Sequence, residues 1–342
     1  MKGTSVILDQ YKGRAAAAFI EDGKLSDFLI DPADQTIPVP GAVFRAVCDR
    51  PLKGQGGMMV RLPNATGFLR EGRGLAPGQP ILVQVTGYAE EGKAVPVTAK
   101  VLFKSRYAIV TPNAPGLNIS RAIRDEDKRD ELLEIAHSVM EESEYGLILR
   151  SICETADADE IAEDIATMLG DAEGVLSAEG TEPELLLDGP NSHLLAWRDW
   201  PTPDSITDEQ GGFATHEVDD MIEQALVPFV RLSGGASMYV EPTRALVAVD
   251  VNTGGDTSPA AGMKANIAAV RDLPRQLRTR GLGGQITLDL APMAKKDRQT
   301  FESILRAAFK HDSVDTTLAG WTPLGHFELQ RKRERLPLAE GM

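Results

Sequence analysis

The chain has 342 residues, of which 42% are hydrophobic and two are cysteines, so it can bury the cores of two or three domains without disulfide bonds. No apolar run approaches the roughly 20 residues that a membrane-spanning helix requires, and the first residues lead into a predicted strand rather than a secretion signal. We therefore expect a cytoplasmic protein that makes no membrane contact and keeps both cysteines as reduced thiols.

The negative charge is concentrated in one stretch of the chain. Residues 151–225 contain 20 Asp and Glu but one basic residue, Arg198, so this stretch carries −19 and the rest carries +4 of the net −15. Residues 271–335 contain 13 Lys and Arg against 8 Asp and Glu, a net of +5. We interpret the acidic stretch as a solvated surface that aids solubility. A polyanion would have to approach elsewhere.

The first third of the chain predicts short strands separated by turns. A hairpin is expected at the N-terminus, because apolar runs flank the turn residues Asp22-Gly23; strands are predicted at 4–9, 14–20 and 24–30. Five more short strands with few helical signals between them are typical of an OB-type barrel; they are predicted at 42–48, 57–62, 67–69, 80–86 and 94–100.

The middle of the chain alternates between strands and helices. Strands are predicted at 107–111 and 145–150, and helices at 130–142 and 158–169. Residues 171–212 are rich in Glu, Pro and Gly, and we interpret them as a shortened, partly irregular linker. A helix from Thr215 is expected to begin a C-terminal α/β domain.

Two apolar runs, 246–251 and 286–290, carry the carboxylates Asp250 and Asp289 near their ends. The residues between them predict a helix, and such strand–helix–strand units are nearly always parallel. Parallel strands end at the same edge of a sheet, so both carboxylates should lie side by side with Asn252. Two carboxylates and an amide suit Mg²⁺, with Mn²⁺ as the alternative ion, which also takes substrate phosphate oxygens. The sequence thus predicts a metal-dependent site for phosphoryl transfer.

Each of these residues also has a structural interpretation. Asp250 could cap the following turn, and Asn252 could be a turn asparagine. Asp289 is expected inside its apolar strand, where an unpaired carboxylate costs several kcal/mol and a metal would offset that cost. Four nearby polar residues are assigned to the surface or to packing: His311, His326, Asp256 and Asp272.

Three segments resemble the catalytic core of the ribonuclease E/G family: Val-Asp-Val-Asn at 249–252, the run 275–284, and Leu-Asp-Leu at 288–290. The segment 325–333 is similar to the closing strand of that family. The resemblance implies an OB-type β-barrel that binds RNA, inserted in an RNase H-like domain and followed by a DNase I-like α/β catalytic domain. The predicted bounds are 1–34 and 112–212 for the RNase H-like parts, 35–111 for the barrel and 213–342 for the catalytic domain.

The resemblance implies a magnesium-dependent endoribonuclease that hydrolyses single-stranded RNA to 5′-phosphate and 3′-hydroxyl ends in RNA processing or decay. Asn252 would bond Asp289 or the scissile phosphate and help to orient the attacking water. Arg150 and Ser151 match a pair that binds a 5′ monophosphate, for which a guanidinium fork and a hydroxyl are suited. The second arginine of that site aligns with Thr316, which predicts a weaker site or one rebuilt from Arg121 or Arg124.

The resemblance also implies contacts that hold the RNA chain. Phe68 matches one of two aromatic residues that stack on bases, whereas the other falls near Met59, which offers no ring. Since stacking is worth about 1–3 kcal/mol per base, a weaker or altered grip is predicted. Four arginines are candidates for RNA contact, three of them also for structural roles in a helix: Arg121, Arg275, Arg278 and Arg280.

The family's closing strand precedes a Cys-Pro-x-Cys pair that shares a zinc ion across a dimer. This chain has no cysteine after Cys153, so it resembles a short member and no zinc link is expected. A homodimer is favoured over a monomer, held by ordinary buried surface. The alternative is a catalytically weak or inactive RNA-binding protein of the same fold, which Met59 and Thr316 favour. A third reading is a metal-dependent phosphohydrolase of a small substrate.

Overall fold

The computed structural model describes residues 3–52, 54, 56–141 and 143–341. Contacts divide the chain into two units, which are described separately. Unit 1 comprises Met1–Ala33, Asn191–His193 and Thr202–Met342, and unit 2 comprises Asp34–Pro190 and Leu194–Pro201. The predicted RNase H-like parts thus fall mainly in different units, and the assignment of RNase H-like and DNase I-like domains stays a prediction.

Five strands of unit 2 close into a barrel. Their order is β4–β5–β6–β8–β7, and β7 pairs again with β4; the bounds are β4 Val43–Leu52, β5 Gly57–Arg61, β6 Thr66–Leu69, β7 Pro80–Val85 and β8 Val95–Thr98. Alternate side chains fill the interior, as period-2 strands require. The five predicted strands are confirmed, and the closed topology is compatible with an OB-type barrel.

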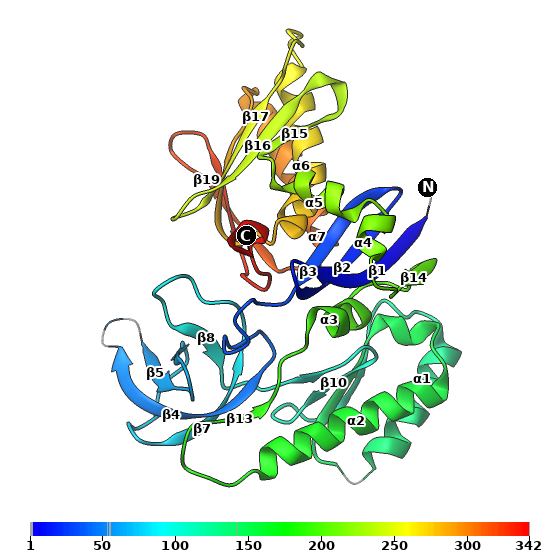
Figure 1. Ribbon diagram of the computed structural model, residues 1–342, viewed down its shortest axis with the longest axis vertical. Helices are drawn as coiled ribbons and strands as arrows, with labels where there is room; N and C mark the ends of the chain where they lie inside the picture. The colour runs from blue at the N-terminus through cyan, green and yellow to red at the C-terminus, as the bar shows by residue number, and fades with distance from the viewer. Residues whose placement is uncertain (1–2, 53, 55, 142, 342) are drawn as a thin grey trace. The chain divides into compact units, whose positions relative to one another are not determined.

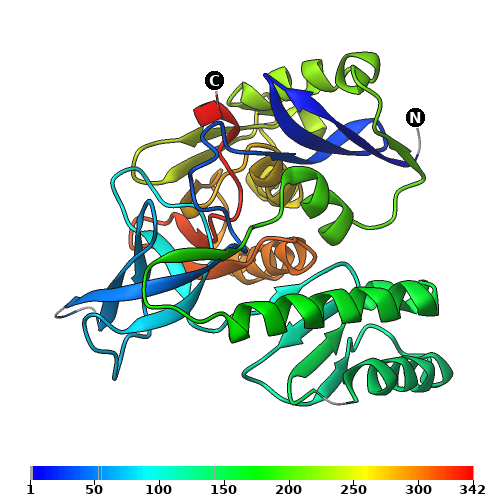
Figure 2. The same ribbon diagram turned by 60° about the horizontal axis from the view of Figure 1, so that its bottom comes forward.

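The second part of unit 2 is a four-stranded sheet with the order β11–β12–β10–β9; the bounds are β9 Phe103–Lys104, β10 Ala108–Thr111, β11 Leu117–Ile119 and β12 Gly146–Leu149. Helices α1 (Glu126–Met140) and α2 (Ala158–Ser177) pack against it and against each other (Figure 2). The carboxylate of Asp125 accepts a bond from the backbone of Lys128 and begins α1, as an N-cap should.

The prediction of a partly irregular linker is confirmed in part, because short regular elements alternate with irregular stretches over residues 171–212. Helix α2 runs on to Ser177, because Ala172 and Val175 are buried in the core and offset the low helix propensity of Gly170 and Gly174. Three short elements follow: β13 (Glu184–Leu187), α3 (Ser192–Asp199) and β14 (Ser205–Thr207). The two strands form by pairing with β4 and with β1 (Thr4–Tyr11), which lie far away in the sequence. A local pattern cannot reveal such partners.

Unit 1 begins with a sheet of the order β14–β1–β2–β3; the bounds are β1 Thr4–Tyr11, β2 Arg14–Glu21 and β3 Lys24–Ile30. The predicted hairpin is confirmed, with Asp22 and Gly23 at φ 50° and 74°, as a two-residue turn of this type requires. The helix predicted from Thr215 occurs as α4 (Gly212–Thr215) and α5 (Val218–Leu226), which share a core with this sheet.

The larger sheet of unit 1 has the order β15–β16–β17–β18–β20–β19, and only β17 and β18 are parallel neighbours (Figure 1). The bounds are β15 Phe229–Arg231, β16 Ser237–Pro242, β17 Val247–Asn252, β18 Gly284–Asp289, β19 Thr316–Trp321 and β20 Phe327–Arg331. Helices α6 (Ala261–Thr279) and α7 (Arg298–Lys310) bury one face of this sheet in a shared core. No helix among the described residues is long and apolar enough to cross a membrane.

Candidate active site

Asp250 and Asp289 face each other on the parallel strands β17 and β18, which confirms the predicted adjacency. Their neighbours Val249 and Leu288 point into the core beneath α6 and α7. Both carboxylates therefore lie on the opposite face of the sheet, where they are exposed. The expectation that Asp289 is buried in an apolar strand was wrong, since it is the last residue of β18 and its side chain is 66% exposed.

Asn252 is the last residue of β17 and projects from the same face as Asp250, two residues away. Its Nδ2 donates a hydrogen bond to Oδ2 of Asp250 at 2.8 Å. The structure therefore shows the amide orienting Asp250 rather than bonding Asp289. A contact with the scissile phosphate stays a prediction.

His326 lies at the same site, beside Asp289. The sequence alone predicts a surface or packing role for it. Its Nδ1 lies 3.3 Å from Oδ1 of Asp289, and its side chain is 34% exposed. It stands here because β18 and β20 are antiparallel, and their register ends at Leu288 opposite Phe327. Only this pairing, which sequence periodicity does not reveal, brings His326 to the site.

Helix α6 fixes the loop that follows Asp289. The fully buried Asn266 donates to the carbonyl of Ala291 and accepts from its N–H, both at 2.9 Å. Gly262 lies so close that a Cβ there would meet the carbonyl oxygen of Pro292 at 1.8 Å. The end of β18 is thereby held against α6, which positions Asp289.

The donor set consists of two exposed carboxylates and an amide, with no group of three Asp, Glu, His or Cys side chains arranged for a metal among the described residues. Asp256 does not add to it. Its pKa is lowered, first by the hydrogen bond from the backbone of Ser258, and its carboxylate also approaches Lys264. Asp272 is bound to Arg275. Any metal at this site would need water or substrate oxygens as further ligands.

Arg150 follows β12, and its guanidinium is engaged within unit 2. Its Nη1 donates to three carbonyl oxygens, those of Ser105 (2.6 Å), Arg106 (3.1 Å) and Arg198 (2.8 Å). Its Nη2 pairs with Asp199 at 3.1 Å. Ser151 is exposed at the start of a short 3₁₀ helix. The predicted 5′-phosphate role of Arg150 and Ser151 is untested, and the observed role of Arg150 is structural.

Asp199 collects three cations around one carboxylate: Lys104 at 2.7 Å, Arg150 at 3.1 Å and Arg198 at 2.7 Å. Burial by itself would raise the pKa of Asp199, but the hydrogen bonds and charges of Arg198 and Lys104 hold the pKa well below its usual range. Burial lowers the pKa of Arg150, and the charge of Asp199 opposes that shift. An internal anion therefore already occupies this cationic cluster.

The three candidate arginines in α6 and directly after it also bind internal acceptors. Arg275 pairs with Asp272 and donates to the carbonyl of Leu25. Arg278 pairs with Asp312 at 2.7 Å, and Arg280, 7% exposed, donates to the carbonyl of Val227. Burial lowers the pKa of Arg280 to about 10. Their RNA contacts stay a prediction, as does that of Arg121, which is exposed.

Phe68 and Met59 lie directly opposite each other on β6 and β5 of the barrel, and both are half-buried. The ring of Phe68 covers Gly57, where a Cβ would meet ring atoms at 2.3 Å. Glycine therefore leaves room for the ring to lie across the strand. The predicted aromatic and its non-aromatic partner thus form one small surface of the barrel.

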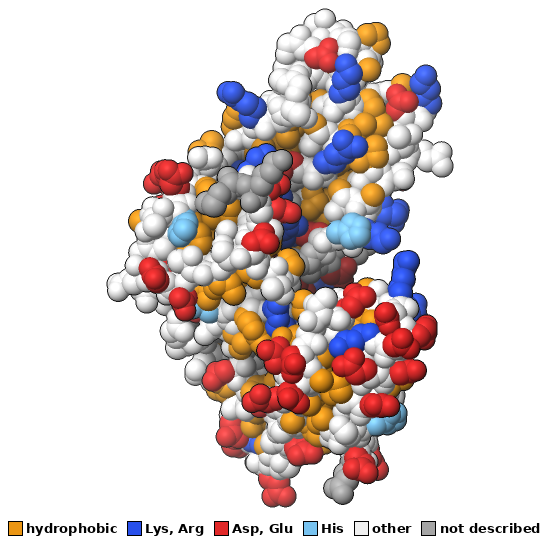
Figure 3. Space-filling view, turned by 90° about the vertical axis from the view of Figure 1, so that its right-hand side faces the viewer, with side chains coloured by type: hydrophobic (Ala, Val, Ile, Leu, Met, Phe, Trp, Pro, Cys, Tyr) orange, Lys and Arg blue, Asp and Glu red, His pale blue; other side chains and the backbone are white. Residues whose placement is uncertain are grey.

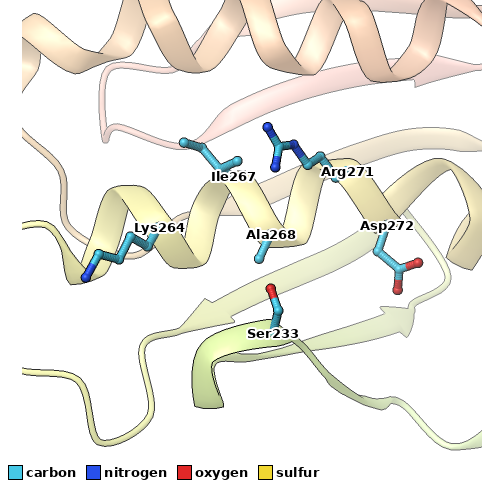
Figure 4. Close-up of a pocket in the computed structure, with 6 residues that line it drawn as sticks. All are labelled: Ser233, Lys264, Ile267, Ala268, Arg271 and Asp272. Carbon is cyan, nitrogen blue, oxygen red and sulfur yellow. The ribbon is translucent and has the colours of Figure 1, made fainter.

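A cavity of about 510 Å³ beside α6 is separate from the carboxylates, because α6 covers the other face of the sheet. Its lining comprises Ser233, Lys264, Ile267, Ala268, Arg271 and Asp272. Figure 4 shows Ser233 and Ala268 pointing toward each other, whereas Arg271 leaves α6 on the other side. Thr316 stands where the resemblance would place the second arginine of the 5′-phosphate site. Its hydroxyl accepts a hydrogen bond from Arg331 at 2.8 Å.

The acidic residues of unit 2 gather on its two long helices. Figure 3 shows this acidic surface, to which α1 and α2 contribute exposed side chains including Glu126, Asp130, Glu134, Asp159, Glu163 and Glu173. Counted over each unit, the formal charge is −11 in unit 2 and −4 in unit 1. The predicted segregation of charge is thus present in the fold, and this surface would repel a polyanion.

Comparison with known proteins agrees with these motifs. The sequence model of the ribonuclease E/G family matches residues 103–207 and 204–334. Ribonuclease E of Nostoc sp. is 27% identical over 301 residues, which cover 76% of this chain and 44% of the relative. Ribonuclease G of Salmonella typhimurium is 28% identical over 300 residues, covering 75% and 60%. Ribonuclease E of Escherichia coli is 27% identical over 319 residues, covering 81% and 29%. The matches thus span between 29% and 60% of the length of these relatives.

Proposed function

The chain belongs to the ribonuclease E/G family, and on this basis we propose that it is an endoribonuclease that hydrolyses single-stranded RNA in RNA processing or decay. The observation that carries the proposal is the register of β17 and β18, which sets Asp250 opposite Asp289 on an exposed face with Asn252 bonded to Asp250. The RNase H-like and DNase I-like domain assignments and a cytoplasmic location belong to the same proposal; the two buried free cysteines support the latter.

The residues of the site fit a hard divalent cation. Mg²⁺ usually binds through one or two carboxylates and retains several waters, which matches two exposed carboxylates without a third protein ligand among the described residues. Asp250 and Asp289 would hold Mg²⁺, or Mn²⁺ in its place. When bound, the ion would polarise the phosphodiester and lower the pKa of an attacking water.

The side chains around the two aspartates position them for hydrolysis. Asn252 holds Oδ2 of Asp250, and α6 fixes the chain after Asp289 through Asn266. Attack by water on phosphorus breaks the bond to the 3′ oxygen, which takes a proton and leaves as a hydroxyl. The downstream fragment then keeps the 5′ phosphate.

Unit 2 would bind the RNA chain and its 5′ end. Phe68 supplies a ring on the barrel surface, and Arg121 supplies an exposed cation. The internal engagement of Arg150 favours a weak 5′-phosphate site. This observation, and the lack of a second aromatic ring at Met59, also favour a second candidate function. In it the chain is an RNA-binding protein of the same fold with little or no catalysis.

Cleavage of a 5′-labelled single-stranded RNA, with and without Mg²⁺, tests the proposal. We expect Asp250→Asn and Asp289→Asn to abolish magnesium-dependent cleavage while RNA affinity and fold change little, because a site with two protein carboxylates cannot lose one. Glu241→Gln is the matched control, since Glu241 is an exposed carboxylate on β16 that pairs with Ala248 rather than Asp250. Wild-type protein that binds RNA without cutting it would support the second candidate. Cleavage by both aspartate variants at the wild-type rate would refute the metal assignment.

A further inference from the structure

The larger sheet of unit 1 carries a transverse row of side chains that continues the active site. Phe229 pairs with Tyr239, Tyr239 with Asp250, and Asp250 with Asp289, on the successive strands β15, β16, β17 and β18. Directly opposed residues of paired strands project from the same face. Two aromatic rings, two carboxylates and then His326 therefore stand in one line across the sheet.

The two rings are exposed although they are large and apolar. Phe229 is 42% and Tyr239 is 39% exposed, and their centroids lie 5.3 Å apart at an interplanar angle of 63°. The adjacent pair on the same two strands, Val230 and Met238, points to the other face and is buried in the core. A surface-exposed aromatic pair beside two carboxylates has the composition of a binding surface rather than of a core.

A cation lies beside the rings on the same face. Arg231 is two residues from Phe229 on β15 and pairs with Ser237, which in turn pairs with Asn252. It is exposed, and no ion pair or hydrogen bond of its side chain is present among the residues that the structure describes. Two flat rings and two carboxylates thus follow one another across four strands about 4.8 Å apart, and the guanidinium lies beside the rings in the next row of the same face.

Single-stranded RNA suits this surface, because each nucleotide carries a flat base beside a charged phosphate, so that a base can lie on the rings while its phosphate lies at the carboxylates. A protein surface laid over the row would have to desolvate Asp250 and Asp289, which is costly without paired cations. A base one strand away from the carboxylates would remain attached to a phosphate lying at them.

We propose that Tyr239 and Phe229 form a base-stacking shelf for the nucleotide that adjoins the scissile phosphate, with Arg231 binding the next phosphate. The inference rests on the proposed function and deepens it, since it assigns the nucleotide-binding subsite beside Asp250. Because larger bases give more stacking area, the shelf favours a purine at that position.

The shelf is tested with a short RNA of one cleavage site in which the adjoining nucleotide is either intact or abasic. We expect Tyr239→Ala to raise KM for the intact RNA by about fivefold to a hundredfold, as for the loss of one stacked base. Removal of the base should produce a similar loss with wild-type protein and no further loss with the variant. Tyr239→Phe keeps the ring and should retain most of the affinity. Ile206→Ala is the matched control, because Ile206 is a 64% exposed apolar residue on a different sheet.

A second measurement keeps the test independent of catalysis. In the Asp250→Asn background, 2-aminopurine at the adjoining position should lose fluorescence on binding by stacking, and Tyr239→Ala should restore it. Equal binding of intact and abasic RNA, or unchanged quenching in Tyr239→Ala, would overturn the shelf even where cleavage proceeds normally. A change of mass by light scattering in Tyr239→Ala, with RNA binding unaltered, would show instead that the rings contact a second copy. If the wild-type protein did not cleave RNA but 2-aminopurine was still quenched on binding, the proposed catalysis would be rejected and the stacking shelf would stand.

Discussion

A single carboxylate, Asp199, organises the most cationic cluster of unit 2. It binds Lys104, Arg150 and Arg198, and it lies at the end of α3, whose last carbonyls accept bonds from Arg150 and Arg106. Cations at a helix C-terminus complement its dipole. The cluster therefore stabilises the fold, and the same charges set how readily an external phosphate can enter.

Asp199 should make unit 2 sensitive to acid. Its pKa is lowered in the folded state, so the stabilisation is fully present above the unfolded pKa of about 3.9 and is lost as the pH falls through the lower folded pKa. We expect Asp199→Asn to destabilise the protein by about 3 kcal/mol at pH 7, because it leaves buried cations uncompensated. Urea unfolding between pH 3 and pH 7 should show a smaller pH dependence in the variant than in the wild type. An unchanged slope would show that other carboxylates govern the acid response.

The occupied guanidinium of Arg150 predicts a modest response to the 5′ end of RNA. A 5′ monophosphate should accelerate cleavage relative to a 5′ hydroxyl or triphosphate, but by less than about tenfold, or about 1.4 kcal/mol. Rates on three RNAs that differ only at the 5′ end measure this. Ser151→Ala should reduce the preference without affecting stability, since Ser151 is exposed. Identical rates on all three RNAs would show that no 5′-phosphate site operates.

At the scale of elements, α6 links the core to the candidate active site. Its apolar side packs on the sheet through residues such as Leu273 and Leu277, while its buried Asn266 bonds the loop after β18. A buried amide that bonds both the N–H and the carbonyl of one loop residue specifies the loop conformation more strictly than an apolar contact would. The helix thus determines the position of Asp289.

Asn266→Ala should therefore affect stability and cleavage together. The variant leaves the N–H and carbonyl of Ala291 without partners in a buried place, which should cost about 2–4 kcal/mol. Chemical unfolding and cleavage rates measure the two effects, with Lys264→Ala as an exposed control on the same helix. Full stability in Asn266→Ala would mean that water replaces the amide and that the loop is held by other contacts.

At the scale of the whole molecule, the distribution of cysteine bears on assembly. Both cysteines of the chain, Cys48 and Cys153, are buried, and burial raises the pKa of the Cys153 thiol to about 11. Burial disfavours both thiols as thiolate ligands of a zinc ion shared between two copies. We therefore expect a homodimer of these residues to be held by ordinary surface contacts.

Chelation should therefore separate catalysis from assembly. We expect EDTA to stop cleavage reversibly, with recovery on addition of Mg²⁺, and to leave the mass unchanged by light scattering, whether it equals the 36.9 kDa chain or twice that value. Zinc analysis of the untreated protein is the control. An oligomer that carries zinc and dissociates with EDTA would require ligands other than the two cysteines.

The sequence by itself determined the features that depend on local pattern and chain order. Apolar runs and turn residues predicted the barrel strands, the hairpin at Asp22-Gly23 and the unit that sets Asp250 beside Asp289. Tertiary structure decided which distant residues meet. It brings His326 beside Asp289 and sets Tyr239 and Phe229 in line with Asp250. It also pairs the short strands β13 and β14 with the distant strands β4 and β1. It also decided that Arg150 binds internal carbonyls. Periodicity reports which face of an element is buried, whereas strand register and side-chain partners depend on segments far away in the sequence.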